Sequence, residues 1–277
     1  MFGVNKTSIK DVQEKILYIM KFIDRICRKK DIEYFIMGGT ALGAVRHGGF
    51  IPWDDDLDIF MTPENYEKFK AIFNEEKNEE FFLQEWKTTP NFLEYAKVRL
   101  NGTTFIEESF KNDKNMHHGI YVDIMILHKC PEKKRVQKFL YFKCKYVTLY
   151  ALSKRNWKPK TKIQKLALLL LKLLPNKFIV NRFYKSIYKY DGLTENFKWF
   201  YWITPANFSA GLFNREFFEN HIDIDFEDCK LMGSAKIVEY LEYRYGDYKT
   251  LPPENKRKEA IHASIYDINK DYKEYIK

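Results

Sequence analysis

Residues 34–61 read YFIMGGTALGAVRHGGFIPWDDDLDIFM, and this stretch decides the fold. Its first four residues are apolar and predict a short strand. The Gly38-Gly39-Thr40 turn follows, and the small residues after it predict one or two turns of helix. A second Gly-Gly pair predicts a loop, and the aspartate-rich run that ends the stretch predicts a second strand.

Alternation along that second strand decides what it presents. Residues two apart on an extended chain share a face, so Asp56 and Asp58 point one way and the apolar residues beside them point the other. Asp54 has the same parity but follows Pro52-Trp53, so either the turn or the strand can hold it. Two carboxylates about 4 Å apart repel by about 4 kcal/mol at an effective dielectric of about 20. A proton, neighbouring bases or a hard cation would relieve that repulsion.

The glycines before the carboxylates supply a complementary feature. Without side chains, the backbone N–H groups of Gly38 and Gly39 at a helix start can approach a phosphate closely. Mg²⁺ takes oxygen ligands and commonly binds substrate phosphates together with carboxylates. An acidic surface loop is the alternative interpretation. The order strand, Gly-Gly turn, helix, loop and strand favours a site for a metal and a phosphate.

The motif from Gly38 to Ile59, GGTxLGAxRHGGFIPWDDDxDI, closely resembles the LicD family of phosphotransferases. That family includes bacterial phosphocholine transferases and the catalytic domains of fukutin-related proteins. The resemblance implies a nucleotidyltransferase-like fold. It also implies a divalent metal, Mg²⁺ or Mn²⁺, held by Asp54, Asp56 and Asp58.

Asp123 is the only charge in residues 119–127, which read as a central strand. A lone acid in an apolar strand is costly unless it meets a partner or a metal, so a salt bridge and a metal both stay open. The family has a Gly-x-x-x-Asp-Ile pattern here, and the resemblance makes Asp123 a metal ligand on a third strand. The sequence departs from the family directly afterwards, where Phe-Pro-Leu-Asp is replaced by residues 125–128, MILH.

Several cations are candidates for phosphate binding. Lys97 and Arg99 lie two apart, hence on one face of a predicted hairpin, 95–100 and 103–107, around an Asn-Gly turn. A phosphate site and solvated strand charges are both open for this pair. Arg46 and His47 are better placed, because the next Gly-Gly turn can bring them back toward the carboxylates. Residues 245–253 resemble the family's closing motif, in which Leu-Pro-Pro is followed by basic residues and a histidine. The resemblance makes Arg257 and His262 the matching candidates in this chain.

The remaining pattern predicts helices and strands around this core. We expect helices at 8–30, from Thr62-Pro63 onward, at 133–150, 163–174, 178–190 and 234–245, and a strand at 81–86. We therefore expect an α+β protein with a nucleotidyltransferase-like mixed sheet and flanking helices. Residues 1–130 would form the catalytic core, and residues 131–277 a basic, mainly helical part that closes on it.

Charge is unevenly distributed in the 277 residues. Residues 129–189 hold 18 Lys or Arg and one acid, a charge of +17, which leaves −8 for the rest of a chain of net charge +9. Residues 163–174 are too short to cross a bilayer, and Lys162, Lys165 and Lys172 mark one side of them. This segment is predicted either to lie on an anionic membrane surface or to be a buried helix.

No secretory signal and no membrane span is apparent, so we expect a cytoplasmic protein at or near the inner face of the cell membrane. The four cysteines show no Cys-x-x-Cys pair and are expected to be reduced thiols without zinc.

The favoured function is metal-dependent chemistry on a phosphoanhydride. The resemblance implies transfer of a phospho-alcohol, phosphocholine foremost, from a CDP-linked donor to a hydroxyl of a glycan or lipid-linked glycan. The metal would be bound by Asp54, Asp56, Asp58 and Asp123, and phosphate by Gly38, Gly39 and Thr40, with Arg46 stabilising charge. Nucleotidyl transfer to RNA or a sugar phosphate, and non-catalytic binding of anionic polymers, are the alternatives. Nucleic acid is not the expected partner.

Overall fold

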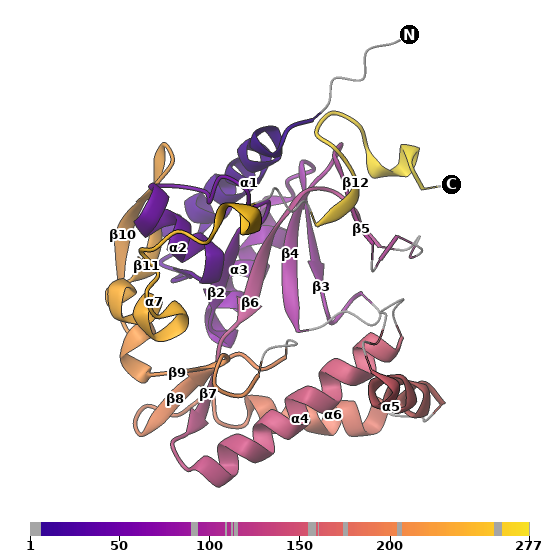
Figure 1. Ribbon diagram of the computed structural model, residues 1–277, viewed down its shortest axis with the longest axis vertical. Helices are drawn as coiled ribbons and strands as arrows, with labels where there is room; N and C mark the ends of the chain where they lie inside the picture. The colour runs from indigo at the N-terminus through magenta and orange to yellow at the C-terminus, as the bar shows by residue number, and fades with distance from the viewer. Residues whose placement is uncertain are drawn as a thin grey trace.

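The computed structural model describes residues 7–89, 94–108, 110–111, 113, 116–154, 159, 161–173, 177–203, 207–257 and 262–276. Over these residues, helices and strands alternate up to α3 (Pro63–Glu76), then five strands and three helices follow in separate runs, and strands from distant segments meet in one central sheet (Figure 1). The expected α+β class is confirmed.

The central sheet has five strands in the order β1-β2-β6-β4-β3. Only β2 and β6 run parallel, and the other neighbours are antiparallel, so the sheet is mixed. The strands are β1 (Phe35–Ile36), β2 (Asp58–Met61), β3 (Phe81–Glu85), β4 (Tyr95–Leu100) and β6 (Tyr121–Ile126). All six residues of β4 are buried, which places this strand well inside the molecule.

Helices α1 (Ile9–Lys29) and α3 (Pro63–Glu76) pack on the sheet and on each other. Ser8 begins α1 with a capping box, in which its side chain and that of Asp11 each bind the other's backbone N–H. Thr62 caps α3 and Pro63 occupies its first turn, as the sequence predicts. Every fourth or third residue of α1 is buried against the sheet, so this face supplies much of the core.

The predicted hairpin between residues 95–100 and 103–107 is wrong. Gly102 does form the turn, with φ of 72°, but β5 (Thr104–Glu107) pairs with β12 (Ala263–Asp267) instead of β4. The physical reason is that a strand has two edges, and β3 and β6 occupy both edges of β4. Strand β5 therefore leaves the sheet and is paired by a segment close to the end of the chain.

Three further groups of strands and helices complete the fold. Strands β10 (His221–Phe226) and β11 (Cys229–Ser234) form a hairpin, and β7 (His128–Pro131), β8 (Phe197–Phe200) and β9 (Leu212–Phe213) form a small sheet. The predicted basic helices are present as α4 (Lys134–Ser153), α5 (Lys162–Leu173) and α6 (Lys177–Tyr188). The division at residue 130 stays a prediction.

Helix α2 (Gly38–His47) follows β1 and contacts α7 (Ile237–Tyr245), which begins three residues later than predicted because β11 extends to Ser234. Short 3-10 helices are η1 (Arg215–Phe218), η2 (Glu254–Lys256) and η3 (Tyr272–Glu274). All four cysteines are free, as expected. Over the described part of the chain, no helix combines the length and the apolar character that crossing a bilayer requires.

Candidate active site

The aspartate-rich segment enters the sheet at Asp58, the first residue of β2. Asp54 and Asp56 lie before the strand, in a segment without regular secondary structure that follows a turn closed by the Asp54 N–H on the Ile51 carbonyl. Their burial still alternates: Asp55 and Leu57 are buried, while the other three aspartates are partly exposed. The predicted sharing of one face therefore holds, although only one of the three belongs to the strand.

Strand register brings Asp123, the carboxylate predicted on a third strand, next to Asp58. Asp58 is paired with Asp123 on the parallel strand β6, and Asp123 is paired with Lys97 on the antiparallel strand β4. Neighbouring strands lie about 4.8 Å apart, so the three residues form one row across the sheet. Two distant acids and one base thus meet at the end of the sheet where β2 and β6 begin.

Lys97 is the immediate partner of Asp123. Its Nζ lies 2.9 Å from Asp123 Oδ1 and 3.1 Å from Oδ2, and 3.2 Å from the centre of the Tyr121 ring. Both charged side chains are buried. The salt bridge that the sequence left open for Asp123 is therefore present in this structure.

The charge of the carboxylates is only partly compensated. Burial and then the charge of Asp54 raise the pKa of Asp56 to about 7. Burial, Asp56 and Asp123 hold the pKa of Asp58 well above its usual value, and burial raises that of Asp123 to about 6 against the pull of Lys97. Such shifts mean that the cluster retains protons or attracts further positive charge.

The donor chemistry suits a hard divalent cation. Carboxylate oxygens are its usual ligands, and Asp123 Oδ1 is buried without a properly oriented hydrogen bond, despite the nearby ammonium. Among the described residues, however, no three His, Cys, Asp or Glu side chains stand close enough together to form a metal site. Binding of a cation by Asp54, Asp56, Asp58 and Asp123 would thus require side-chain rearrangement.

The glycine turn lies against these carboxylates at the start of α2. Gly38 has φ of 55°, and a Cβ on Gly39 would stand 2.9 Å from Asp54 Oδ2. The N–H of Gly38 donates to the Tyr240 hydroxyl, and Thr40 Oγ1 accepts the N–H of Asp58. Within the described residues, the N–H groups of Gly39 and Thr40 have no hydrogen-bond partner. Phosphate binding by this turn stays a prediction.

Arg46 and His47 end α2 and face the tail of the chain. Arg46 donates through Nε to His47 Nε2 at 3.0 Å and through Nη1 to the Tyr248 carbonyl at 3.0 Å. Burial lowers the pKa of Arg46, and nearby Arg257 lowers it further. Burial and Arg46 also lower the pKa of His47. The structure therefore joins two of the predicted cations, Arg46 and Arg257, beside the loop after α7.

Neither Lys97 nor Arg99 is a solvated strand charge, because both are almost fully buried. Lys97 lies within the carboxylate row. Arg99 donates to the Gln84 side chain and to the Gly119 carbonyl, and its guanidinium lies over the Tyr121 ring. The structure thus ties Arg99 into the sheet, and a phosphate contact of this residue stays a prediction.

His262 reaches the site from the far end of the chain. Its backbone N–H donates to Asp55 Oδ2 at 2.7 Å, and its ring Nδ1 lies 2.5 Å from Oδ1. The hydrogen bond with Asp55 raises the pKa of His262 to about 9, with further contributions from Asp56 and Asp54. A protonated imidazole therefore stands beside the carboxylates.

Sequence reasoning missed three residues of the site. Asp55 is buried by its parity and holds His262, and Tyr240 and Tyr245 come from α7. The Tyr245 hydroxyl lies 3.9 Å from where a Cβ of Gly38 would be, and the charges of Asp58 and Asp54 help raise the pKa of Tyr245 after burial does. The parity of Asp55 was a usable signal. Nothing local in the sequence indicated the two tyrosines.

The departure from the family pattern at residue 128 has a structural outcome. His128 is buried between Asp191, at 2.9 Å from Nδ1, and Glu94, at 3.3 Å from Nε2. Burial works against its charge, but the two carboxylates outweigh it and raise the pKa of His128 to about 10. In this chain the position holds an ion-pair network away from the aspartate cluster.

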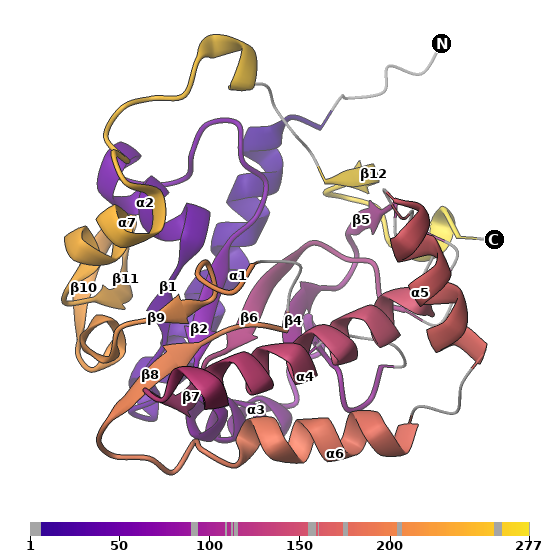
Figure 2. The ribbon, with the colours of Figure 1, turned by 60° about the horizontal axis from the view of Figure 1, so that its bottom comes forward.

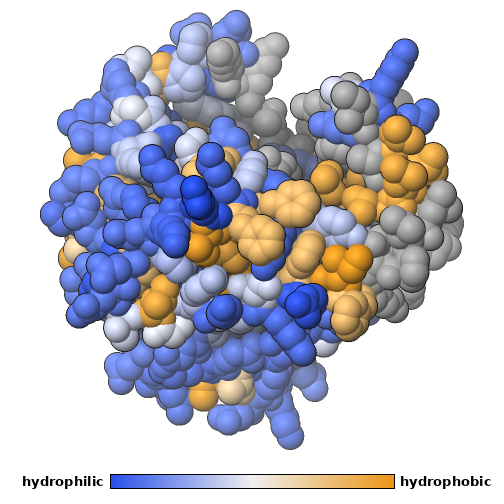
Figure 3. Space-filling model, turned by 90° about the horizontal axis from the view of Figure 1, so that it is seen from below, coloured by the Kyte–Doolittle hydropathy of each residue, from blue (hydrophilic) through white to orange (hydrophobic). Residues whose placement is uncertain are grey.

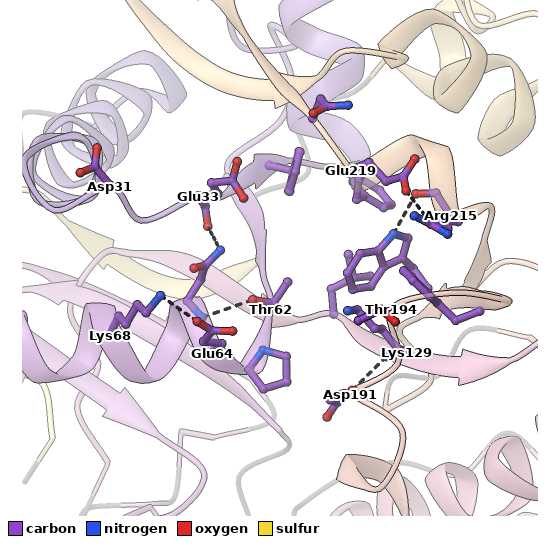
Figure 4. A pocket seen from close by; sticks show the side chains of 18 residues that line it. Asp31, Glu33, Thr62, Glu64, Lys68, Lys129, Asp191, Thr194, Arg215 and Glu219 are labelled. Carbon is purple, nitrogen blue, oxygen red and sulfur yellow. Dashed lines mark hydrogen bonds and ion pairs between the residues drawn. The ribbon is translucent and has the colours of Figure 1, made fainter.

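A pocket of about 760 Å³ lies at the opposite end of the same strands (Figure 4). Thr62 and Leu127, which line it, follow the last residues of β2 and β6, about 13 Å along the strand from Asp58. Its charges are largely paired, as in Glu64 with Lys68 and Arg215 with Glu219. The pocket is therefore separate from the carboxylates.

The chain is similar to known proteins. Residues 31–157 match the family model described as LicD/FKTN/FKRP, nucleotidyltransferase domain. The chain is 24% identical over 262 residues to the lipopolysaccharide cholinephosphotransferase LicD of Haemophilus influenzae, covering 92% of this chain and 96% of that protein. An uncharacterized protein of Rickettsia prowazekii is 32% identical over 130 residues, 47% of this chain and 45% of that protein. The matched region contains every carboxylate of the cluster.

Proposed function

Residues 31–157 match the LicD family, and from this premise we propose that the chain transfers a phospho-alcohol, phosphocholine foremost, from a CDP-linked donor to a hydroxyl of a cell-surface glycan. The acceptor class would be a teichoic acid, lipopolysaccharide or capsule precursor. The observation that carries the proposal is the row Asp58, Asp123 and Lys97, which gathers carboxylates beside a glycine turn. The Haemophilus relative is a lipopolysaccharide cholinephosphotransferase, which supports phosphocholine as the group transferred.

We propose Mg²⁺ or Mn²⁺ as the cofactor, held by Asp56, Asp58 and Asp123 with Asp54 beside them. When bound, the cation would neutralise negative charge on the phosphoanhydride and on the leaving CMP. The raised pKa values of Asp56 and Asp58 support this assignment, since a cation would replace the protons that burial and the neighbouring carboxylates now favour.

The chain's own cations would complete the site. Gly39 and Thr40 offer backbone N–H groups at a helix start, where a phosphate oxygen is favoured. Protonated His262 lies against Asp55 and can hold a phosphate of the donor, and we propose the same role for Arg46, which lies at the end of α2 against the Tyr248 carbonyl. Arg46 would stabilise the charge that develops on the departing phosphate, the kind of contact that raises turnover.

Product analysis tests the reaction. With CDP-choline labelled in the choline and a glycan acceptor, we expect labelled glycan and free CMP, and no product in excess chelator. Asp58→Asn should abolish transfer while the protein still folds. Asp225→Asn, on the exposed face of β10, is the matched control and should remain fully active. Full activity in chelator or in Asp58→Asn would exclude the metal assignment.

Nucleotidyl transfer is the second candidate, because the matched domain is described as a nucleotidyltransferase domain. It requires attack on the phosphorus next to the nucleoside, so CTP would yield pyrophosphate and a cytidylated product. Release of pyrophosphate from CTP without choline transfer would favour this candidate over the first.

We also propose that the protein works at the cytoplasmic face of the cell membrane, where a lipid-linked acceptor would be available. The basic segment of residues 129–189 supports this location, since anionic lipid attracts Lys and Arg.

A further inference from the structure

Helices α4, α5 and α6 carry most of the basic segment, and their surface is unusual in its charge. Residues 129–189 contain one acid against 18 basic residues. Among the ion pairs found in the described part of the chain, none involves Lys143, Arg182, Lys185 or Lys189. Arg182, Lys185 and Lys189 are exposed and Lys143 is partly exposed, and none of the four has a carboxylate partner among the described residues.

Helix α6 places its charges in one row. Phe178, Arg182 and Lys185 are spaced by four and three residues, and Lys189 continues the row four residues later. All four are exposed, and the Phe178 ring is 77% exposed. A hollow of about 460 Å³ lies along the same face, lined by Phe178, Asn181, Arg182, Tyr184 and Lys185. The row combines one large apolar ring with three cations.

Helix α4 extends this surface, because it packs alongside α6 (Figure 2). Phe139 and Phe142 are 59% and 61% exposed. Lys143 Nζ lies 4.2 Å from the centre of the Phe139 ring and 5.9 Å from that of Phe183 on α6. Burial lowers the pKa of Lys143, and Arg182 and Lys189 lower it further, so these cations share one surface.

Helix α5, which also packs on α4, adds exposed leucines. Leu166, Leu169 and Leu170 are each more than half exposed, whereas Leu168 is buried. The spacing by three and four residues puts the exposed ones on one face. Seen from below, apolar side chains gather on the side of the molecule that α5 occupies (Figure 3). The buried alternative for this helix is therefore wrong for these leucines.

We propose that α4, α5 and α6 form a docking surface for an anionic phospholipid bilayer. Cations would meet the headgroups, and the exposed Phe and Leu side chains would enter the boundary between headgroups and acyl chains. Exposed leucines favour lipid over a polyanion such as RNA, because a nucleic acid offers them no apolar phase. This surface would place the enzyme beside a lipid-linked acceptor. Its biological role rests on the proposed function, whereas its binding to lipid does not.

The sequence placed this contact on α5 alone, through Lys162, Lys165 and Lys172. The structure shows Lys162 and Lys165 exposed, and the side chain of Lys172 lies outside the described residues. The row on α6 is the stronger basic feature, because its charges adjoin those of α4.

Vesicle co-sedimentation tests the surface in the full-length protein. Vesicles of phosphatidylglycerol and phosphatidylcholine in equal parts should bind the wild type, and pure phosphatidylcholine should bind it weakly. High salt should release the protein, because surface charges are screened. The triple variant Arg182→Glu, Lys185→Glu, Lys189→Glu should lower the binding constant by about two orders of magnitude or more.

A matched control keeps the net charge change identical. Lys10→Glu, Lys29→Glu, Lys30→Glu alters exposed lysines at the two ends of α1 and should bind nearly as well as the wild type. Leu166→Asn with Leu169→Asn leaves the charge unchanged and should weaken binding even in low salt, which separates the apolar contribution from the charge. Circular dichroism should show that every variant folds.

Three outcomes would overturn the proposal: a wild type that stays in the supernatant with both kinds of vesicle, equal losses in the two triple variants, or binding to heparin without binding to anionic vesicles. Transfer from CDP-choline to a water-soluble acceptor is measured in parallel. Vesicle binding without transfer would remove the proposed function and leave the docking surface. Transfer without vesicle binding would do the reverse.

Discussion

Asp123 lies between a like charge and an opposite charge on its two neighbouring strands. Asp58 is level with it on β2, and Lys97 is level with it on β4. The Lys97 ammonium also sits over the Tyr121 ring, which favours a desolvated cation. One lysine thus offsets part of the repulsion among several acids, and burial together with the remaining repulsion raises the pKa values of Asp56 and Asp58.

Lys97→Met should destabilise the metal-free protein at pH 7.5 by about 3 kcal/mol, because it leaves the buried Asp123 carboxylate without its ammonium partner. Adding Asp123→Asn to Lys97→Met should recover most of that loss, since both charges are then gone. Urea denaturation of the two single variants and the double variant measures the coupling. A double variant no more stable than Lys97→Met would show that Lys97 and Asp123 do not stabilise each other.

Asp56→Asn should have the opposite effect in the metal-free protein. The pKa of Asp56 is about 7 in the fold against a usual value near 3.8, so ionisation costs stability progressively as pH rises from about 4 to about 7. The free energy of unfolding of the variant should equal that of the wild type near pH 4 and exceed it at pH 7.5 by about 1 kcal/mol or more. Urea midpoints at several pH values test this. Mg²⁺ should then stabilise the wild type more than the variant. If the free energy of unfolding depends on pH identically in both proteins, Asp56 does not have a raised pKa in the fold.

At the scale of elements, helix α2 contacts the C-terminal part of the chain at both of its ends. Its first residue, Gly38, binds α7 through Tyr240, and Arg46 in its last turn binds the Tyr248 carbonyl. The hairpin of β10 and β11 holds the loop after it, where Glu227 Oε1 accepts the Phe50 N–H at 2.9 Å. A Cβ on Gly49 would collide with the same glutamate, so this glycine permits the close approach.

Arg46→Ala should lower kcat about tenfold or more and change KM for the donor little, because charge grows on the leaving phosphate in the transition state. Arg25→Ala, on an exposed ion pair of α1, is the control and should leave both constants unchanged. A raised KM with normal kcat would instead make Arg46 a ground-state clamp. No change in either would restrict Arg46 to holding the tail.

At the scale of the whole molecule, a buried ionic network joins segments that are far apart in sequence. His128 opens β7, Glu94 precedes β4, and Asp191 follows α6 and also accepts the Lys129 N–H. The network therefore attaches the end of the basic helices to the central sheet. Its charges are buried, so its stability depends on the protonation of the histidine.

Stability should fall as pH rises from about 6.5 to about 10. The pKa of His128 is raised to about 10 in the fold, so its protonated form stabilises the protein fully below about 6.5 and that contribution is lost as pH passes through 10. Between pH 6.5 and 10, the free energy of unfolding of His128→Gln should fall by at least ~1 kcal/mol less than that of the wild type. Chemical denaturation of both proteins from pH 6.5 to 10 measures the difference. Parallel curves would mean that His128 is neutral in the fold.

Local features of this protein could be read from the sequence. Ser8 and Thr62 start their helices, the apolar residues of α1 face the sheet, and the aspartates of the opening stretch alternate in burial as their spacing requires. Side-chain alternation and capping depend on residues a few positions apart, so a single sequence contains the information. The motif around those aspartates likewise indicated the LicD family, because it is contiguous in sequence and does not depend on tertiary contacts.

Tertiary structure alone decided which partner each element takes. An apolar pattern says that a strand is buried but not which edge it meets, and the Asn-Gly turn after β4 could not reveal that β3 and β6 fill both edges of that strand. Asp55 and His262 are 207 residues apart, and Tyr240 is 202 residues from Gly38. Contacts over such separations depend on how sheets and helices pack. The sequence therefore determined the carboxylates and offered Lys97 and His262 as candidates, and the fold determined which carboxylates these two residues contact and which tyrosines surround them.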